Sequence, residues 1–421
     1  MSLWRHRDFL LLWSGEAVSQ VGTMVSHLAL PLLAATALGA TPWEMGLLVA
    51  AERAGFLLVG LPAGALVDRL PRRPVMIAAD LVRFVLFASV PVAWWLGVLT
   101  FAQVVAVALL GGLATVFFDV GYQSILPAVV GRRGLVEGNA KLESTRAAAE
   151  ATGPALGGGL VQLAGAATAV LLDAATYLVS AAFLARMRTV DVAAPRDPRR
   201  SLRADMAEGL RYVLGHPLLR PIAACTGTAN LFLSVLAAVS VLFLARELGL
   251  PAGVIGLVLA AGSVGGVLGA LTASRWIGRF GQGRTLMRAL LLTGPLALVL
   301  PLTTAGAGLA WYALGTFGSA YGAVVYNVAQ VSFRQSVCPD RLLGRMNASI
   351  RFLVWGTIPL GGLLGGALGE LLGLRATLLV AGTGIALAPL WLVASPLRGL
   401  RDLPSAPDRK YGTHLDGPAS H

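Results

Sequence analysis

Long apolar segments recur along almost the whole chain and are separated by short polar turns. Each is about as long as the roughly 20 helical residues that cross ~30 Å of hydrocarbon. Membrane-spanning strands would instead appear as alternating segments of about 10 residues. The pattern therefore predicts an all-α membrane protein with twelve transmembrane helices. We expect these spans at residues 9–36, 43–67, 74–96, 100–121, 143–164, 167–187, 218–245, 252–274, 285–303, 308–333, 347–369 and 375–395.

The first apolar segment needs a separate decision, because basic residues precede it as they precede a secretory signal peptide. Its apolar run continues far beyond a typical signal core and contains Glu16. We interpret it as a retained first span.

Composition supports the membrane assignment, and charge placement orients the chain. Of the 421 residues, 56% are hydrophobic and only 13% charged, whereas soluble domains carry roughly a quarter charged residues. The net charge of +12 is compatible with binding to nucleic acid or to anionic lipid. The distribution of the basic residues along the chain decides whether the charge reflects such a partner or the membrane topology. Arginines gather at the N-terminus, in alternate turns and in the central connection, whereas the opposite turns hold only Arg246 and Arg375. The positive-inside rule therefore predicts a multi-pass protein of the cell (plasma or inner) membrane with both termini cytoplasmic, and no nucleic-acid partner.

The second half of the chain repeats features of the first. After the fourth span the chain reads LPAVVGRRGLVEGNAKLESTRAAAEATGPALGGGL, and after the tenth it reads CPDRLLGRMNASIRFLVWGTIPLGGLLGGAL. Both contain a basic turn, an Asn-Ala pair, and then a proline with a glycine cluster. The matching Asn139 and Asn347 are 208 residues apart, close to half the chain. This repeat predicts two pseudo-symmetric six-helix bundles, residues 1–187 and 218–396, with a transport site between them.

The remaining segments are polar. In the connection at 188–217, apolar residues recur at helical spacing from Leu202 to Leu214. The spacing predicts an amphipathic helix on the cytoplasmic membrane surface, and we favour an ordinary connecting helix with a lipid-facing stripe over a functional role. The tail at 397–421 has prolines and no apolar run, so we expect it to be disordered.

The segment GALVDRLPRRPVM, residues 64–76, joins the second and third spans. It resembles the G-x-L-x-D-R-x-G-R-R signature of the major facilitator superfamily. The matching residues are Gly64, Leu66, Asp68, Arg69, Arg72 and Arg73, with Pro71 in place of the usual glycine. The resemblance implies a gating motif that ties helix ends together and favours one access state, with Asp119 as a partner for Arg72 or Arg73. If the arginines only obeyed the positive-inside rule, Asp68 would have no explanation.

The fifth span contains EATGPALGGGLV, residues 150–161, which local helix stability does not explain. Gly153, Pro154, Gly157 and Gly158 resemble the G-P-x-x-G-G motif that this superfamily has chiefly in proton-coupled drug antiporters. We expect a closely packed, bent helix that serves as a seam about which the two halves rock. Helix packing without a role in transport is the alternative. The segments EGLRYVLGHPLLRPI in the central connection and LLGRMNASIRF before the eleventh span resemble the branch of this superfamily that includes enterobactin exporters and macrolide efflux pumps.

An energy source must be found elsewhere than in ATP, because neither of the two lysines, Lys141 and Lys410, lies in a phosphate-binding loop. An ion gradient remains, so ionisable residues inside the spans are candidates for coupling. One face of the first span carries Glu16, Gln20, Thr23 and His27. Since this helix lines the central cavity in the resembling superfamily, Glu16 is our first candidate for protonation and His27 a further one.

Other charged residues inside the spans have competing explanations. Glu52 and Arg53 are neighbours in the second span and point in different directions, so they serve either coupling or interhelical pairing. Asp173 is less easily dismissed, although the sixth span tends to lie outside the cavity in the resembling superfamily. Two groups are expected to stabilise the structure only: Glu143 with Arg146 and Glu150, and Asp80 with Arg83.

The second half offers polar and aromatic residues without buried charge. These are Asn230 and Ser234 in the seventh span, and Tyr312, Thr316, Ser319, Tyr326 and Gln330 in the tenth. We expect them to line a substrate cavity together with Gln20 and Thr23, and interhelical packing is the alternative.

These observations lead to the hypothesis of a proton-driven antiporter that exports a small, partly apolar molecule, such as a drug, an antibiotic or a siderophore. An importer on the same fold and a non-transporting membrane sensor or scaffold are the alternatives, and sodium remains open as the coupling ion. An enzyme is disfavoured, because the sequence has no metal-ligand cluster, nucleophile motif or phosphate loop. We expect a monomer without cofactor or metal.

Overall fold

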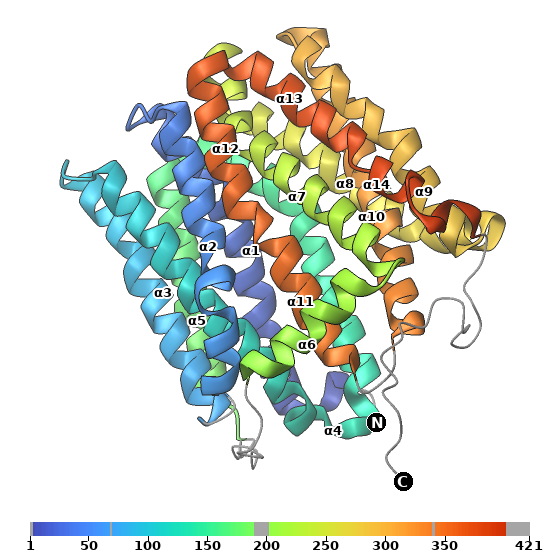
Figure 1. Ribbon diagram of the computed structural model, residues 1–421. Coiled ribbons are helices and arrows are strands. Elements are labelled where there is room, and N and C mark those ends of the chain that lie inside the picture. The colour runs from blue at the N-terminus through green and yellow to red at the C-terminus, as the bar shows by residue number, and fades with distance from the viewer. Residues whose placement is uncertain (1–2, 68–69, 189–201, 339–341, 401–421) are drawn as a thin grey trace. The chain divides into compact units, whose positions relative to one another are not determined.

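The computed structural model describes residues 3–67, 70–188, 202–338 and 342–400, and these residues form helices and short connections without a strand (Figure 1). The helices of the first part are α1 (Arg7–Thr36), α2 (Pro42–Val67), α3 (Arg72–Trp95), α4 (Phe101–Ala164), α5 (Ala166–Ala185) and α6 (Leu202–Gly215). Those that follow are α7 (Leu219–Leu242), α8 (Ala252–Phe280), α9 (Gln282–Thr293), α10 (Leu309–Val337), α11 (Leu343–Trp355), α12 (Thr357–Leu372), α13 (Leu374–Leu387) and α14 (Leu390–Val393). Short 3₁₀ or π segments are η1 (Leu3–Arg5), η2 (Phe243–Glu247), η3 (Gly294–Leu302), η4 (Gly306–Gly308) and η6 (Pro396–Gly399).

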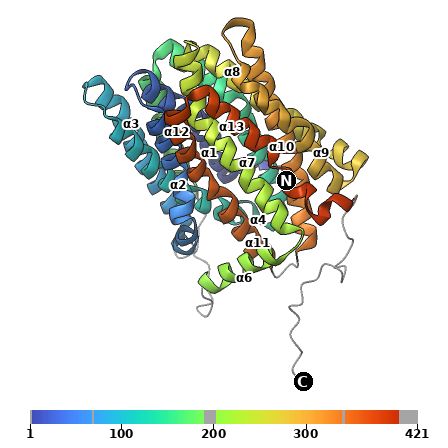
Figure 2. The same cartoon turned by 45° about the horizontal axis from the view of Figure 1, so that its top comes forward.

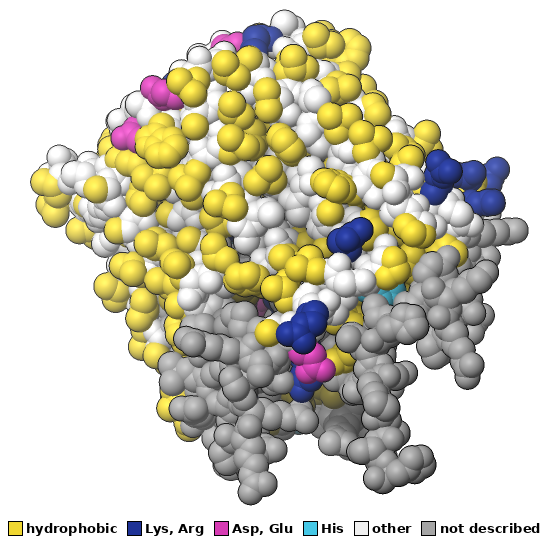
Figure 3. Space-filling model, in the orientation of Figure 1, with side chains coloured by type: hydrophobic (Ala, Val, Ile, Leu, Met, Phe, Trp, Pro, Cys, Tyr) yellow, Lys and Arg dark blue, Asp and Glu magenta, His cyan; other side chains and the backbone are white. Residues whose placement is uncertain are grey.

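The all-helical prediction is confirmed, and each of the twelve predicted spans coincides with helical segments. In the described part of the chain, nine segments are long and apolar enough to cross a membrane. Large apolar side chains are widely exposed on these helices. Figure 3 shows such side chains over most of the described surface in that view, with few charged groups among them. A surface of this kind suits hydrocarbon rather than water.

Local chemistry explains where several helices begin. Thr41 and Glu44 form a reciprocal capping box at the start of α2, in which Glu44 N donates to Thr41 Oγ1 at 3.2 Å and Thr41 N donates to Glu44 Oε2 at 2.7 Å. Pro42 takes the first helical position, where its missing N–H costs no hydrogen bond. Thr100 caps α4 by accepting from the Gln103 backbone N–H.

The connection between the fourth and fifth predicted spans differs from the expectation. Residues 122–142, which lie between them, are helical, and only Gly131 leaves helical geometry, with φ +67° and ψ 168°. Ile125 and Val129 explain the extra helix, because they are buried in one apolar cluster with Phe9 of α1. A positive φ favours glycine, so one residue suffices to turn the chain.

Several later spans are interrupted rather than continuous. The eleventh predicted span is divided into α11 and α12 at Gly356, and the twelfth into α13 and α14 around Pro389. Pro295 stands near the start of η3, where the ninth span narrows from an α-helix to a 3₁₀ helix. Proline lacks the N–H that continues an α-helix, which accounts for the breaks at Pro389 and Pro295.

The chain clusters into two compact units. Unit 1 comprises residues 1–196, 237–263 and 362–377, and unit 2 comprises residues 197–236, 264–361 and 378–421. In unit 1, α1 packs along α5 and α4, α3 packs on α4 and α5, and α2 packs on α4. In unit 2, α10 packs on α9 and η3, and α11 packs on α6, which Figures 1 and 2 show side by side.

The turns of each unit lie at two ends of its helices. In each unit, the end whose turns contain or adjoin arginines is called its basic end: the turns at 70–71 and 186–188 in unit 1, with Arg72, Arg73 and Arg186, and the turn at 281 in unit 2, between Arg279 and Arg284. The other end, with the turns at 37–41, 96–100, 248–251 and 373, is called the opposite end.

The polar connection and the tail were partly anticipated. The expected amphipathic helix is present as α6, where Glu208 forms an ion pair with Arg345 of α11. The tail begins later than predicted, because Pro396–Gly399 form η6 and Leu397 is fully buried in an apolar cluster of unit 2. The expected disorder of the remaining tail concerns residues outside those described.

Candidate functional site

A cavity of about 110 Å³ lies among α1, α2, α3, α4 and α5 in unit 1. Its polar wall consists of Thr23, Ser26, His27, Glu52, Arg53, Thr115 and Tyr177. Phe56 and Phe87 are among the apolar residues of the wall. Charged, hydroxyl and aromatic groups suit a partly apolar molecule, but the volume is below the roughly 300–1,000 Å³ of typical ligand sites, so a drug-sized substrate requires this cavity to widen.

The four polar residues predicted on one face of α1 all point into the bundle. Gln20 Nε2 donates to Glu16 Oε1 at 2.6 Å. Thr23 Oγ1 and the Tyr177 hydroxyl share a hydrogen bond of 3.1 Å. Glu16 itself is buried, so its carboxyl group is removed from lipid by the surrounding helices.

His27 and Glu52 are brought together across the cavity. His27 Nδ1 of α1 contacts Glu52 Oε1 of α2, and both side chains are about one quarter exposed. Arg53 also lines the cavity and is an exposed residue. Glu52 and Arg53 therefore have different surroundings, as their adjacent positions in one helix predict.

Asp173 of α5 is the residue that the sequence interpretation underrated. It is 1% exposed, and its Oδ2 accepts a hydrogen bond from the Tyr177 hydroxyl at 3.3 Å. An added Cβ at Gly22 of α1 would lie only 2.5 Å from Asp173 Oδ1, so α1 and α5 meet closely here. The expectation that the sixth span lies outside the central cavity between the halves stays a prediction. Within unit 1, this span contributes Tyr177 to the cavity wall. Its own polar stripe, Asp173, Tyr177 and Ser180, would have revealed this by the criterion applied to α1.

Asp80 and Arg83 of α3 also belong to this buried polar interior rather than only anchoring a helix end. The two side chains form a buried ion pair. The Arg83 guanidinium lies 4.4 Å from the ring centroids of both Phe118 and Tyr177, so two aromatic faces enclose it. Glu16 lies within electrostatic reach of Arg83 and Asp80, and also of Asp119 of α4.

The balance of charge in this interior is uneven. Among the described residues of unit 1, Glu16, Asp80 and Asp173 are buried there, and Arg83 is the buried cation among them. Isolated buried charges are costly, so a surplus of carboxyl groups favours the binding of protons.

The predicted gating motif is described only in part. Asp68 and Arg69 lie outside the described residues, and Gly64 lies in the last turns of α2. Arg73 Nε donates to the Leu184 carbonyl at 2.8 Å, and its guanidinium also contacts the Ala185 carbonyl, so it caps the end of α5.

Arg72 begins α3 and has its backbone carbonyl beside Gly121, two residues after Asp119 of α4. The pairing of Asp119 with Arg72 remains a prediction.

The glycines of the predicted exporter motif face two different helices. An added Cβ at Gly153 would strike the Met24 side chain of α1, and one at Gly157 would lie 3.3 Å from Val25 Cα. On the other side, an added Cβ at Gly158 would lie 2.5 Å from the Ala252 carbonyl oxygen of α8. The second half of α4 is therefore packed tightly between α1 and α8 within unit 1.

Pro154 and Gly256 complete the contact between α4 and α8. A Cβ at Gly256 would collide with the Pro154 carbonyl and lie 2.9 Å from Gly158 Cα. A second glycine contact joins α2 and α12, where an added Cβ at Gly366 would lie 3.0 Å from Gly46 Cα. Such backbone approaches require residues without a side chain.

Charged residues join helix termini at the opposite end of unit 1. Arg246 Nε donates to the Ala35 carbonyl at the end of α1 at 2.9 Å. Arg375 pairs with Glu247 at 2.5 Å. These contacts satisfy a terminal carbonyl and pair two of the few charges at this end.

The residues predicted to line a cavity in the second half bond mainly within unit 2. Asn230 donates to the Val354 carbonyl at 3.3 Å, and Ser234 to the Ile358 carbonyl at 2.7 Å. The Tyr326 hydroxyl and Thr226 Oγ1 are 2.7 Å apart. The others lie on α10: Thr316 and Ser319 donate to carbonyls of their own helix, Gln330 donates to Asn327, and Tyr312 is buried. Their contact with substrate remains a prediction.

The network Glu143, Arg146 and Glu150 is confirmed, because Arg146 contacts both acids on an exposed face of α4.

The helical spans, the glycine contacts and the polar interior together define a transporter of the major facilitator fold. The sequence matches the family described as transmembrane secretion effector over residues 1–416, and the chain belongs to this family. It is thus a multi-pass membrane transporter and not an enzyme.

Similar proteins agree with this assignment. The chain is 30% identical over 366 residues to the multidrug efflux pump Tap of Mycolicibacterium fortuitum, covering 82% of this chain and 85% of that protein. It is 28% identical to the enterobactin exporter EntS of Salmonella choleraesuis, covering 87% of each chain. Among solved structures, a bacterial homologue of the iron transporter ferroportin has a TM-score of 0.73 at 19% identity, over 94% of this chain and 99% of that one, which concerns the fold alone.

Proposed function

We propose that this protein is a proton-driven antiporter that exports a small, partly apolar molecule by alternating access. Protons move inward through the polar interior of the first six spans as substrate moves outward. Glu16 takes up and releases the coupling proton. His27 and Glu52 line the neighbouring cavity and respond to its contents. Arg53 is the cationic residue at this cavity and contributes to its charge balance.

The surplus of buried carboxyl groups carries the proposal. Glu16, Asp80 and Asp173 share the interior with Arg83 as their buried cation. Arg83 is committed to Asp80 by an ion pair, which leaves Glu16 and Asp173 as the other two buried acids, and we assign the exchange of the proton to Glu16. Because Gln20 already donates to Glu16, the carboxyl group is held in a fixed orientation in either protonation state.

The energy available from one proton is sufficient for uphill export. A proton that moves down a membrane potential of 100 mV releases about 2.3 kcal/mol. Each 1.4 kcal/mol corresponds to a tenfold concentration ratio, so one proton sustains a substrate gradient of about 50-fold.

The names of the relatives and the cavity composition guide the substrate class. Tap is named as a multidrug efflux pump and EntS as an enterobactin exporter. Phe56, Phe87 and Tyr177 offer apolar contact, while Thr23 and Glu52 offer polar contact. We propose a drug, an antibiotic or a siderophore as the substrate. Gln20 and the predicted cavity residues of α7 and α10 contact the substrate in the second access state.

The orientation in the membrane follows from the distribution of arginines, and the division into two bundles follows from the sequence repeat. We propose a monomer in the plasma or inner membrane with both termini in the cytoplasm, since arginines crowd the basic end. The bundles 1–187 and 218–396 rock about α4 and α8, and the gating motif around Asp68 stabilises one access state. We assign no nucleic-acid partner.

The test is transport into everted membrane vesicles from a pump-deficient strain. Ethidium and a catecholate siderophore serve as probes, and the vesicles are energised by respiration with and without a proton uncoupler. The variants are Glu16→Gln and, as a matched control, Glu143→Gln, which removes an exposed acid of the same type.

We expect uncoupler-sensitive uptake of at least one probe by the wild-type protein and by Glu143→Gln. Glu16→Gln should fold normally and lose uphill uptake. Uptake that resists the uncoupler, or that persists at full rate in Glu16→Gln, would refute the proposed coupling.

A further inference from the structure

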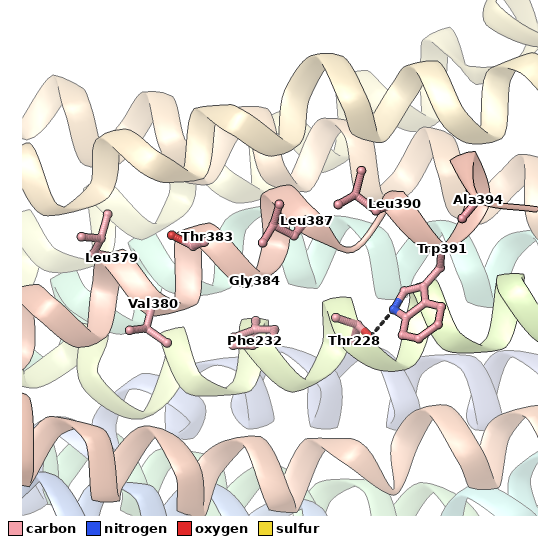
Figure 4. A pocket seen from close by; sticks show the side chains of 10 residues that line it. All are labelled: Thr228, Phe232, Leu379, Val380, Thr383, Gly384, Leu387, Leu390, Trp391 and Ala394. Carbon is pink, nitrogen blue, oxygen red and sulfur yellow. Dashed lines mark hydrogen bonds between the residues drawn. The ribbon is translucent and has the colours of Figure 1, made fainter.

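A groove on unit 2 lies between α7 and the pair α13 and α14 (Figure 4). Its volume is about 660 Å³, within the range of about 300–1,000 Å³ typical of ligand sites. Thr228 and Phe232 contribute one wall, and Thr383, Leu387 and Trp391 contribute the other. The wall is apolar apart from the two threonines and the indole N–H.

The polar groups of the groove largely satisfy one another. Trp391 Nε1 donates to Thr228 Oγ1 at 3.1 Å, as the dashed line in Figure 4 shows. A ligand therefore need not supply a partner for the indole N–H. Hydrocarbon is the chemistry that such a wall accepts without a loss of hydrogen bonds.

Two sequence features keep the groove open. An added Cβ at Gly384 would collide with the Phe232 ring, so this ring packs directly on the backbone of α13 instead of filling the space beside it. Between Leu387 and Leu390 the helix is interrupted at Pro389, which separates α13 from α14. The interruption leaves Trp391 beside the groove rather than in register with α13.

The groove lies on segments that cross the membrane. Both Leu219–Glu247 and Leu374–Val393 are long and apolar enough to span. Leu379, Leu387 and Trp391 are 50%, 52% and 53% exposed, although all three are large and apolar. Side chains of this kind on a spanning helix contact lipid tails.

The basic end of the groove carries positive charge from arginines of two chain segments. Leu397 of η6 is buried in one apolar cluster with Leu218, which directly precedes α7, and with Ile222 of α7, so the two chain segments lie together. The exposed Arg220 and Arg398 lie on these segments. Residues 216–228 and 388–400 contain no Asp or Glu. The charge at this end is therefore complementary to a phosphate group.

We propose that this groove binds an anionic glycerophospholipid from the membrane. One acyl chain lies along Phe232 and Leu387, Trp391 lies at the level of the ester groups, and the phosphate contacts Arg220 and Arg398. Tryptophan commonly takes this interfacial position. Bound in this way, the lipid joins the start of α7 to α13 and α14 and stabilises their packing. The site is independent of the proposed proton coupling.

The experiment uses the fluorescence of Trp391 as a local sensor. Full-length protein is reconstituted in phosphatidylcholine bilayers with increasing fractions of phosphatidylglycerol brominated on its acyl chains. Brominated phosphatidylcholine is titrated in parallel. The chain has nine tryptophans, so the signal of Trp391 is obtained as the difference between the wild-type protein and Trp391→Phe.

Three variants separate the parts of the proposal. Arg220→Gln with Arg398→Gln removes the phosphate contacts. Arg275→Gln with Arg279→Gln removes the same charge from exposed positions near the end of α8 and is the matched control. Thr383→Phe narrows the groove from its exposed wall.

We expect Trp391 to be half-quenched at a lower fraction of brominated phosphatidylglycerol than of brominated phosphatidylcholine. Each surface arginine contributes about five-fold, so the preference is about 25-fold for two arginines. It should vanish in the Arg220 and Arg398 variant and persist in the Arg275 and Arg279 variant. Thr383→Phe should weaken quenching by both lipids.

Three results would overturn the proposal. Equal quenching by the two lipids at every fraction would show a surface wetted by bulk lipid. A preference that survives loss of Arg220 and Arg398 would place the headgroup elsewhere. Absence of quenching by either lipid, or quenching unaffected by Thr383→Phe, would show that something other than an acyl chain covers the groove, such as a second copy of the chain.

Discussion

The contact between α4 and α8 offers a test in which two neighbouring glycines should behave differently. A methyl group added at Gly158 would lie 2.5 Å from the Ala252 carbonyl oxygen and 2.8 Å from Gly256 Cα. Both atoms belong to backbone, so a side-chain rotation cannot relieve the clash. At Gly159, the next residue, an added Cβ meets nothing within 4 Å. Gly159→Ala is therefore a matched control for Gly158→Ala.

The size of the effect follows from two terms. Both substitutions gain about 0.5–1 kcal/mol because alanine favours a helix over glycine. Gly158→Ala alone adds an overpacking cost of about 1–3 kcal/mol. The helix gain cancels in the comparison, so Gly158→Ala should be less stable than Gly159→Ala by about 1–3 kcal/mol. Gly159→Ala itself should be as stable as the wild type or slightly more stable.

The assay is thermal unfolding of the purified variants in one detergent, followed by tryptophan emission. Heating a membrane protein is commonly irreversible, so the order of the apparent melting temperatures at one scan rate is the informative quantity. We also expect Gly158→Ala to lower transport and Gly159→Ala to retain it, since α4 and α8 must approach closely if they form a seam. If the two variants melt and transport alike, the close backbone contact described here is wrong.

Further predictions concern charged side chains. Arg83→Met should destabilise the protein by about 3–5 kcal/mol, because it leaves the buried Asp80 without its partner. The double variant with Asp80→Asn should recover much of the loss, as measured by yield of folded protein in size-exclusion chromatography. Arg246→Met removes the donor that bonds the Ala35 carbonyl in the last turn of α1. It should lower the free energy of unfolding by about 1 kcal/mol, which is visible as a lower apparent melting temperature. An unchanged temperature would contradict this contact. Glu208→Ala breaks the exposed ion pair with Arg345 and should change stability by less than about 1 kcal/mol, so a larger loss would mean that α6 carries more of the fold than one pair.

The fold was largely predictable from the sequence because hydrocarbon imposes long apolar helices. The spans and the amphipathic α6 follow from length and periodicity alone. The continuation of α4 through residues 122–142 was missed, because the sequence of its basic turn is typical of a loop. Burial of Ile125 and Val129 in an apolar cluster stabilises the helix there. The divisions at Gly356 and around Pro389 were missed for a related reason, because composition gives the length of an apolar run but not its continuity.

The candidate site was predictable only where a single helix reveals it. The stripe from Glu16 to His27 was recognised because its polar residues recur on one face of an otherwise apolar helix. Asp173 was given no role and Arg83 was expected to anchor a helix end, since the direction in which a helix face points depends on its neighbours. The contact between His27 and Glu52 joins two helices and has no signature in either one.

The most direct test of the account is proton movement by the purified protein in liposomes that contain a pH-sensitive dye. An outward gradient of a transported probe is applied at zero membrane potential, and the internal pH is followed. We expect probe efflux to draw protons inward, so that the interior acidifies in the wild-type protein and in Glu143→Gln but not in Glu16→Gln. Efflux without acidification in the wild type, or acidification unchanged in Glu16→Gln, would contradict the claim that a proton bound at Glu16 drives export.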